Sequence, residues 1–113
     1  MTTFLKAYID CALWSSTDND GEPLDDGGYT LSAGAQARMA ADCTTFQAAH
    51  AGLLARAGDD TQNGHDYWLT RNRHGAGFWD RGYPQTVSAA LTEAAHADGE
   101  CNLYAGDDGL LYI

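Results

Sequence analysis

The chain has 113 residues with sixteen acidic and six basic side chains, and its formal net charge of −10 argues against direct binding to nucleic acid or to an anionic membrane. Its length suits a single small domain, and it has neither an apolar run near the roughly 20 residues of a membrane span nor a recognisable signal peptide. Cys11, Cys43 and Cys101 are odd in number and form no C-x-x-C pair, so we expect reduced, buried thiols of a cytoplasmic protein.

The first helix is expected to run from a cap at Thr2 or Thr3 to about Trp14, because apolar side chains recur there at helical spacing. Residues 17–29 follow as a predicted loop, since they combine one proline and three glycines with five carboxylates and contain no lysine or arginine. The five loop acids are Asp18, Asp20, Glu22, Asp25 and Asp26.

A second helix is predicted from about Leu31 or Ser32 to Ala57, where apolar side chains recur at spacings of three and four. Two glycines within this range, Gly34 and Gly52, each weaken it by roughly 1 kcal/mol relative to alanine. A turn at residues 58–61 would then lead into the next segment.

The stretch Asn63–Tyr83 concentrates scarce residue types, with two of the three tryptophans, two of the four histidines and three of the six bases. Residues 67–72 alternate at the two-residue period of a strand, and glycines within 74–77 can reverse the chain so that 78–81 returns alongside. We therefore expect a β-hairpin. Its large aromatic side chains are expected to be structural: Trp68, Phe78 and Trp79.

Pro84 is expected to start a third helix, with Gly99 as a C-terminal cap just past its end. The last segment is predicted to be a second hairpin, with strands at 101–105 and 110–113 around a turn at 106–109. These elements predict an α+β fold in one domain, with about three helices on one face of an antiparallel sheet of about four strands.

One group of side chains could bind a metal or transfer protons: His65, Asp66, His74 and Asp80. Their spacing matches no H-E-x-x-H or C-x-x-C pattern. More simply, His65 and Asp66 can cap the start of a strand, and His74 can lie in a solvated turn. We therefore expect no cofactor and no metal, and we keep a small metal-dependent hydrolase as the less favoured alternative.

The carboxylates are the other candidate site. Asp107 and Asp108 lie in the second hairpin turn, where they could form a second acidic rim together with Asp98 and Glu100. Carboxylates at intervals of several ångströms can imitate a duplex, whose charges are spaced about 1.7 Å along its axis. Composition alone favours the simpler explanation, that acidity keeps the protein soluble.

Several runs resemble a family of small acidic proteins encoded by bacteriophages and prophages. They are residues 64–72 (GHDYWLTRN), 74–82 (HGAGFWDRG), 103–109 (LYAGDDG) and 8–16 (YIDCALWSS). Arg73 departs from the pattern, because a small residue, often glycine, is expected there. The resemblance implies a phage accessory protein in the cytoplasm of the bacterial host, and it transfers no catalytic residues.

A small, acidic, phage-type protein suggests an anti-defence inhibitor that acts by binding rather than turnover. We expect an anti-CRISPR, in preference to an antirestriction factor, that acts as a DNA mimic on the basic surface of a host nucleic-acid-binding complex. A phage structural or assembly protein, with hairpin aromatics at its interface, is the alternative. The expected partner-binding acids are Asp18, Asp20, Glu22, Asp25, Asp26, Asp107 and Asp108.

Overall fold

Side-chain caps set the start of three helices in the computed structural model, which describes residues 1–113. Thr2, Ser32 and Asp59 each accept a hydrogen bond from the backbone N–H three residues later, at 3.1, 3.1 and 2.8 Å. Such a cap satisfies a backbone donor that a helix leaves unpaired at its N-terminus. The helices are α1 (Thr3–Ser15), α2 (Ala33–Ala49), α3 (Ala51–Ala55), α4 (Asp60–Arg71) and α5 (Gln85–Ala97), with 3₁₀ turns η1 (Leu24–Asp26) and η2 (Phe78–Asp80).

The predicted first and third helices are present as α1 and α5, and Gly99 follows α5 with φ of +80°. The predicted second helix is divided at His50, whose φ of −126° and ψ of 24° interrupt the helical backbone between α2 and α3. No helix of the protein combines the length and the apolar character that crossing a membrane requires.

The sheet has three strands in the order β1 (Thr30–Leu31), β3 (Leu110–Tyr112) and β2 (Tyr104–Ala105). β2 and β3 form the predicted C-terminal hairpin, with Tyr104 opposite Tyr112. β1 pairs with β3 in parallel, so the sheet is mixed. The α+β class is confirmed, whereas three helices on a four-stranded antiparallel sheet is wrong.

The predicted hairpin at Asn63–Tyr83 is wrong, because α4 occupies residues 60–71 and η2 follows it. The alternation over 67–72 does not separate two faces, since all residues from 67 to 71 are buried. Contacts with α1, α5 and η2 enclose α4, and a helix enclosed in this way can bury large side chains around much of its circumference. Burial by the surrounding elements therefore outweighed the strand-like, two-residue alternation of the local sequence.

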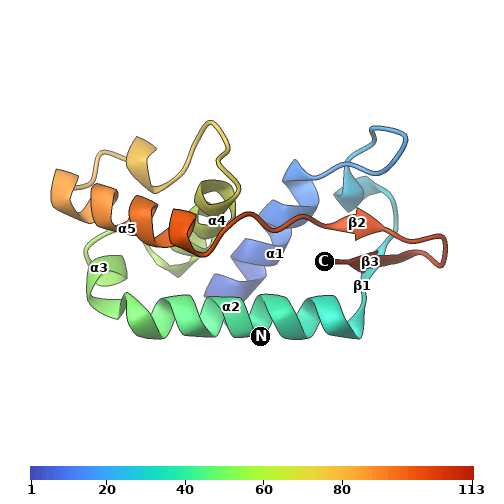
Figure 1. Ribbon diagram of the computed structural model, residues 1–113, viewed down its shortest axis with the longest axis horizontal. Helices are drawn as coiled ribbons and strands as arrows, with labels where there is room; N and C mark the ends of the chain where they lie inside the picture. The colour runs from blue at the N-terminus through green and yellow to red at the C-terminus, as the bar shows by residue number, and fades with distance from the viewer.

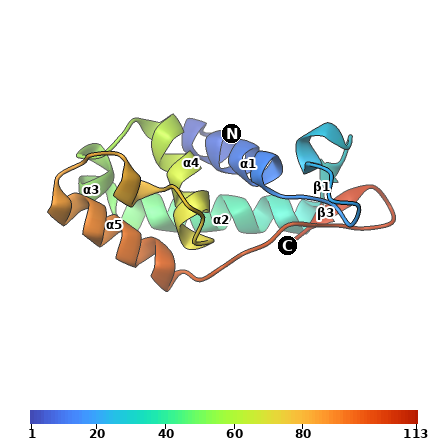
Figure 2. The same ribbon diagram turned by 90° about the horizontal axis from the view of Figure 1, so that it is seen from above.

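The molecule is elongated, with extents of 44 × 25 × 21 Å. α2 runs along its length, α3 and α5 lie toward one end, and the sheet lies at the other (Figures 1 and 2). Twenty buried apolar residues form one cluster. At its centre the Tyr67 ring stacks between Tyr8 at 5.2 Å and Phe46 at 4.0 Å, which joins α4 to α1 and α2.

Gly64 allows α4 to approach α1, because a Cβ at this position would lie 2.2 Å from the Phe4 carbonyl oxygen. We expect Gly64→Ala to lower the free energy of unfolding by about 2 kcal/mol, since the two helices must move apart. Gly34→Ala is the matched control: the added methyl meets nothing within 4 Å, so stability should rise by up to about 1 kcal/mol. Urea unfolding followed by circular dichroism measures both, and equal effects would contradict the close approach.

Arg73 has a φ of +58°, a left-handed conformation that favours glycine, at the C-terminal end of α4. Its exposed side chain forms no hydrogen bond or ion pair. We expect Arg73→Gly to raise the free energy of unfolding by about 1 kcal/mol, because it removes the steric conflict of Cβ. Arg73→Ala keeps the Cβ and should leave stability nearly unchanged in the same assay. A stabilisation shared by both variants would instead point to the lost charge.

Candidate functional site

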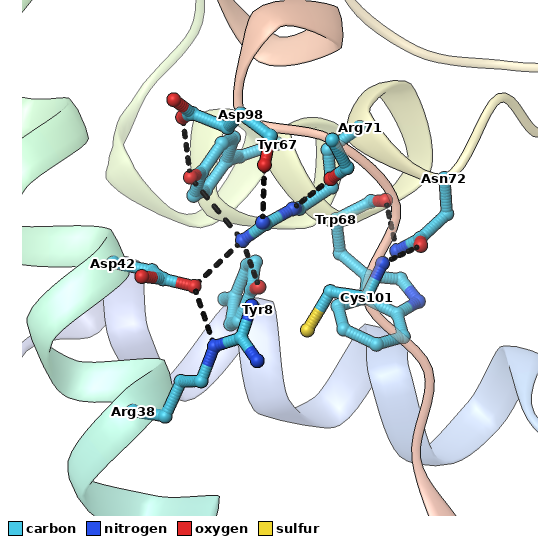
Figure 3. A network of polar contacts seen from close by, with 10 residues as sticks. Tyr8, Arg38, Asp42, Tyr67, Trp68, Arg71, Asn72, Asp98 and Cys101 are labelled. Carbon is cyan, nitrogen blue, oxygen red and sulfur yellow. Dashed lines mark hydrogen bonds and ion pairs between the residues drawn. The ribbon is translucent and has the colours of Figure 1, made fainter. Parts of the chain in front are cut away.

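The densest polar centre of the protein is the guanidinium of Arg71, whose side chain is only 2% exposed (Figure 3). Its Nη1 donates to the Tyr8 hydroxyl at 3.1 Å and to Asp42 Oδ2 at 2.8 Å. Its Nε and Nη2 donate to the backbone carbonyls of Gly99 and Asp98 at 2.9 and 3.1 Å. One side chain therefore holds α1, α2 and the end of α5 against α4.

The hydroxyl of Tyr67 completes this network. It donates to Asp98 Oδ2 at 2.7 Å and accepts from Arg71 Nη1 at 3.4 Å, while its ring lies 5.3 Å from the Arg71 guanidinium carbon. Burial raises the pKa of Tyr67 and of Tyr8, so both phenols remain neutral. The guanidinium is thus enclosed by its own chain, and its role is structural.

Asp66 is a second buried ion, with a fully buried side chain in α4. Arg81 binds it through two nitrogens, with Nη2 at 2.8 Å from Oδ1 and Nε at 3.1 Å from Oδ2. Gln62 Nε2 donates to the same carboxylate at 3.1 Å. The hydrogen bond to Asp66 raises the pKa of Arg81, and this bidentate pair fastens the chain after η2 to α4.

The four residues of the hydrolase alternative do not form a common site. Asp66 is engaged by Arg81, and His65 lies beside Trp14 with ring centroids 6.2 Å apart. His74 and Asp80 are exposed. No group of three or more histidine, cysteine, aspartate or glutamate side chains is arranged to hold a metal ion.

The three cysteines are free and buried, as the sequence predicts. Burial raises the pKa of the Cys11 and Cys43 thiols to about 12, so they remain protonated at neutral pH. Protonated, buried thiols are poor nucleophiles, and these side chains contribute to packing.

Of the three aromatics expected to be structural, Trp68 and Phe78 are buried. Trp68 Nε1 donates to Ser15 Oγ at 2.9 Å, and the Phe78 backbone N–H donates to Thr70 Oγ1 at 3.1 Å. The expectation is wrong for Trp79, which is 51% exposed because η2 turns its ring toward solvent rather than into a sheet face.

Two acidic stretches far apart in the sequence meet at the sheet end of the molecule. The backbone N–H of Thr30, directly after the acidic loop, donates to the carbonyl of Gly109 in the hairpin turn at 3.2 Å. The parallel β1–β3 pairing thus places the loop acids of residues 18–26 at the same end as Asp107 and Asp108 (Figures 1 and 2). We call this region the acidic end.

The second acidic rim expected from the sequence does not form. Asp98, at the end of α5, accepts the Tyr67 hydroxyl at 2.7 Å in the polar network of Arg71. Asp107 and Asp108 lie instead in the hairpin turn at the sheet end, well away from α5 (Figure 1). Asp107 and Asp108 therefore lie with the loop acids at the sheet end and not with Asp98 at the end of α5.

None of the seven acids at the acidic end forms an ion pair. The ion pairs of the protein use other acids, and they are Lys6–Asp10, Arg38–Asp42, Arg71–Asp42 and Arg81–Asp66. The two remaining bases, Arg56 and Arg73, follow α3 and α4 in the chain and form no ion pair. Negative charge at the acidic end is therefore uncompensated.

Two of the seven acids shape the acidic end. Asp18 Oδ1 accepts the backbone N–H groups of Asp20 and Glu22 at 2.9 and 3.0 Å, and the bond from Glu22 is the main cause that holds the pKa of Asp18 below its usual value. Asp108 accepts the Leu110 N–H at 3.0 Å and the Tyr112 hydroxyl. The other five make no side-chain hydrogen bond: Asp20, Glu22, Asp25, Asp26 and Asp107.

A hollow of about 480 Å³ lies beside the acidic loop, lined by Asp10, Leu13, Trp14, Asp25 and His65. It brings together α1, η1 and α4, and Trp14 in its wall is 63% exposed. This site was not predicted from the sequence, although a tryptophan just before an acidic loop is a signal that could have indicated it. The chain matches no protein-family model, no curated protein and no solved structure.

We expect Arg71→Met to lower the free energy of unfolding by about 3–5 kcal/mol, because it leaves buried carbonyls and the Asp42 carboxylate without their donor. Arg38→Met is the matched control, since Arg38 faces the same Asp42 at 3.6 Å but is half exposed. Its loss should cost about 0.5 kcal/mol or less. Urea unfolding compares them, and similar losses would show that Arg71 is not the centre of the fold.

Proposed function

We propose that this protein is a phage-type anti-defence inhibitor that binds the basic surface of a host nucleic-acid-binding complex through its acidic end. The complex is a CRISPR effector in the cytoplasm of the bacterial host, and the protein acts there as a DNA mimic. The observation that carries the proposal is the β1–β3 pairing, which gathers two acidic stretches at one end of the molecule.

The unpaired state of these acids supports a binding role. No lysine or arginine of the chain has to be displaced before they meet a partner, because none forms an ion pair with them. A net charge of −10 attracts a basic surface at long range, and carboxylates then compete with phosphates for the same arginines and lysines.

The partner class follows from what such a surface would displace. CRISPR effectors hold nucleic acid in a positively charged channel that recognises its backbone rather than its sequence. Carboxylates can occupy such a channel, and the hydrogen bonds that Asp18 and Asp108 accept give a defined shape to the loop and the hairpin turn that carry the acids. The resemblance to small acidic phage proteins agrees with this class of partner.

A phage structural or assembly protein is the second candidate, and one observation favours it. Three aromatic side chains are more than half exposed, namely Trp14, Trp79 and Tyr104. Aromatic residues of this kind are enriched where proteins associate. Such an interface would be nearly indifferent to salt, whereas binding through the acidic end should weaken as salt is added.

Capture of partners from a bacterial host that carries defence systems, followed by a DNA-cleavage assay on the captured effector, tests the proposal. We expect the quadruple variant Asp20→Asn, Glu22→Gln, Asp26→Asn and Asp107→Asn to inhibit about tenfold less, because four surface charges contribute a few tenths of a kcal/mol each.

The control replaces four exposed acids outside the acidic end by amides, and they are Asp60, Asp80, Glu93 and Glu100. It removes the same charge, so equal losses in the two variants would show that net charge alone matters. Capture of capsid or tail proteins in place of an effector would favour the assembly alternative.

A further inference from the structure

The hollow beside the acidic loop combines an exposed aromatic ring with carboxylates. Trp14 lies in the last turn of α1 with 63% of its surface exposed, and Leu13 lines the hollow beside it. The His65 ring of α4 lies 6.2 Å from the indole, with 36° between the planes. The indole therefore lies beside the His65 ring and leaves most of its surface open to a flat group that can stack on it.

Two carboxylates accompany this ring. Asp25 of η1 makes no hydrogen bond and no ion pair, so its charge is available. Asp10 of α1 is paired with Lys6 at 2.6 Å, but both side chains are more than half exposed. An exposed pair of this kind contributes little and can exchange partners. The walls of the hollow therefore carry two carboxylates and no lysine or arginine.

We propose that this hollow binds the guanidinium group of an arginine side chain presented by the partner. A guanidinium is planar and weakly hydrated, so it can stack on the Trp14 indole while its N–H groups reach Asp25 and Asp10. A volume of about 480 Å³ accommodates one such side chain. The inference rests on the proposed function for the source of the arginine, a basic protein surface.

Other ligand classes fit less well. An anion would meet the carboxylates of Asp10 and Asp25, and the acidic and histidine side chains here are not arranged to hold a metal ion. A lysine ammonium is a strongly hydrated point charge that cannot stack or bind a carboxylate in a bidentate manner. The second hollow, beside Trp79, has a single carboxylate, Glu93, and serves as an internal comparison.

The test uses the blocked peptide acetyl-Gly-Arg-Gly-amide and ¹⁵N-labelled protein. The indole N–H groups of Trp14, Trp68 and Trp79 give three separate signals, of which Trp68 is buried and Trp79 is exposed elsewhere. We expect a saturable shift of the Trp14 signal alone. The citrulline peptide, which is isosteric but neutral, should bind at least about fivefold more weakly, and so should the lysine peptide.

Matched variants locate the site. Asp25→Asn should weaken binding of the arginine peptide about threefold, whereas Asp26→Asn removes the neighbouring charge of the same 3₁₀ turn outside the hollow and should leave binding unchanged. Trp14→Leu should abolish saturable binding, read from the Asp25 backbone signal. Equal binding of arginine and citrulline peptides to the unaltered protein, or equal effects of the two aspartate variants, would overturn the inference.

The peptide experiment and the inhibition assay can fail separately. If the arginine peptide binds at Trp14 but the protein inhibits no effector, the arginine site is supported and the proposed function is contradicted. Inhibition that requires Asp20, Glu22, Asp26 and Asp107, together with no arginine preference at Trp14, supports the function and overturns the inference.

Discussion

The structure depends on the burial of one cation. A buried guanidinium is costly unless its N–H groups find acceptors, and here Arg71 of α4 meets them on α1, α2 and the end of α5. The carbonyls of Asp98 and Gly99 suit it well, because the C-terminal end of a helix carries partial negative charge. Four helices must therefore be in place together before this side chain is satisfied.

The same network directs the chain toward the acidic end. After Gly99 accepts from Arg71, the backbone N–H of Cys101 donates to Asn72 Oδ1 at 2.7 Å, so two successive points are fastened to the end of α4. The chain then crosses to the sheet, where β3 pairs with β1 (Figure 1). The position of the hairpin turn beside the acidic loop is thus linked to the packing of the helices.

The distribution of the few bases matters more to the surface than the number of acids. Arg71 and Arg81 neutralise Asp42 and Asp66 within or beside the core, while Lys6 pairs with Asp10 on α1. None reaches the loop or the hairpin turn. No base of the chain forms an ion pair with the acids of the acidic end, so its carboxylates retain the full attraction for a basic partner.

The sequence by itself determined the features that depend on neighbouring residues: the capped start of α1, the end of α5 before Gly99, the C-terminal hairpin and the acidic loop. Tertiary structure decided the rest. Residues 67–71 alternate like a strand, but they form a helix because surrounding elements bury them all. The β1–β3 pairing and the hollow at Trp14 join residues distant along the chain, and no local period encodes such contacts.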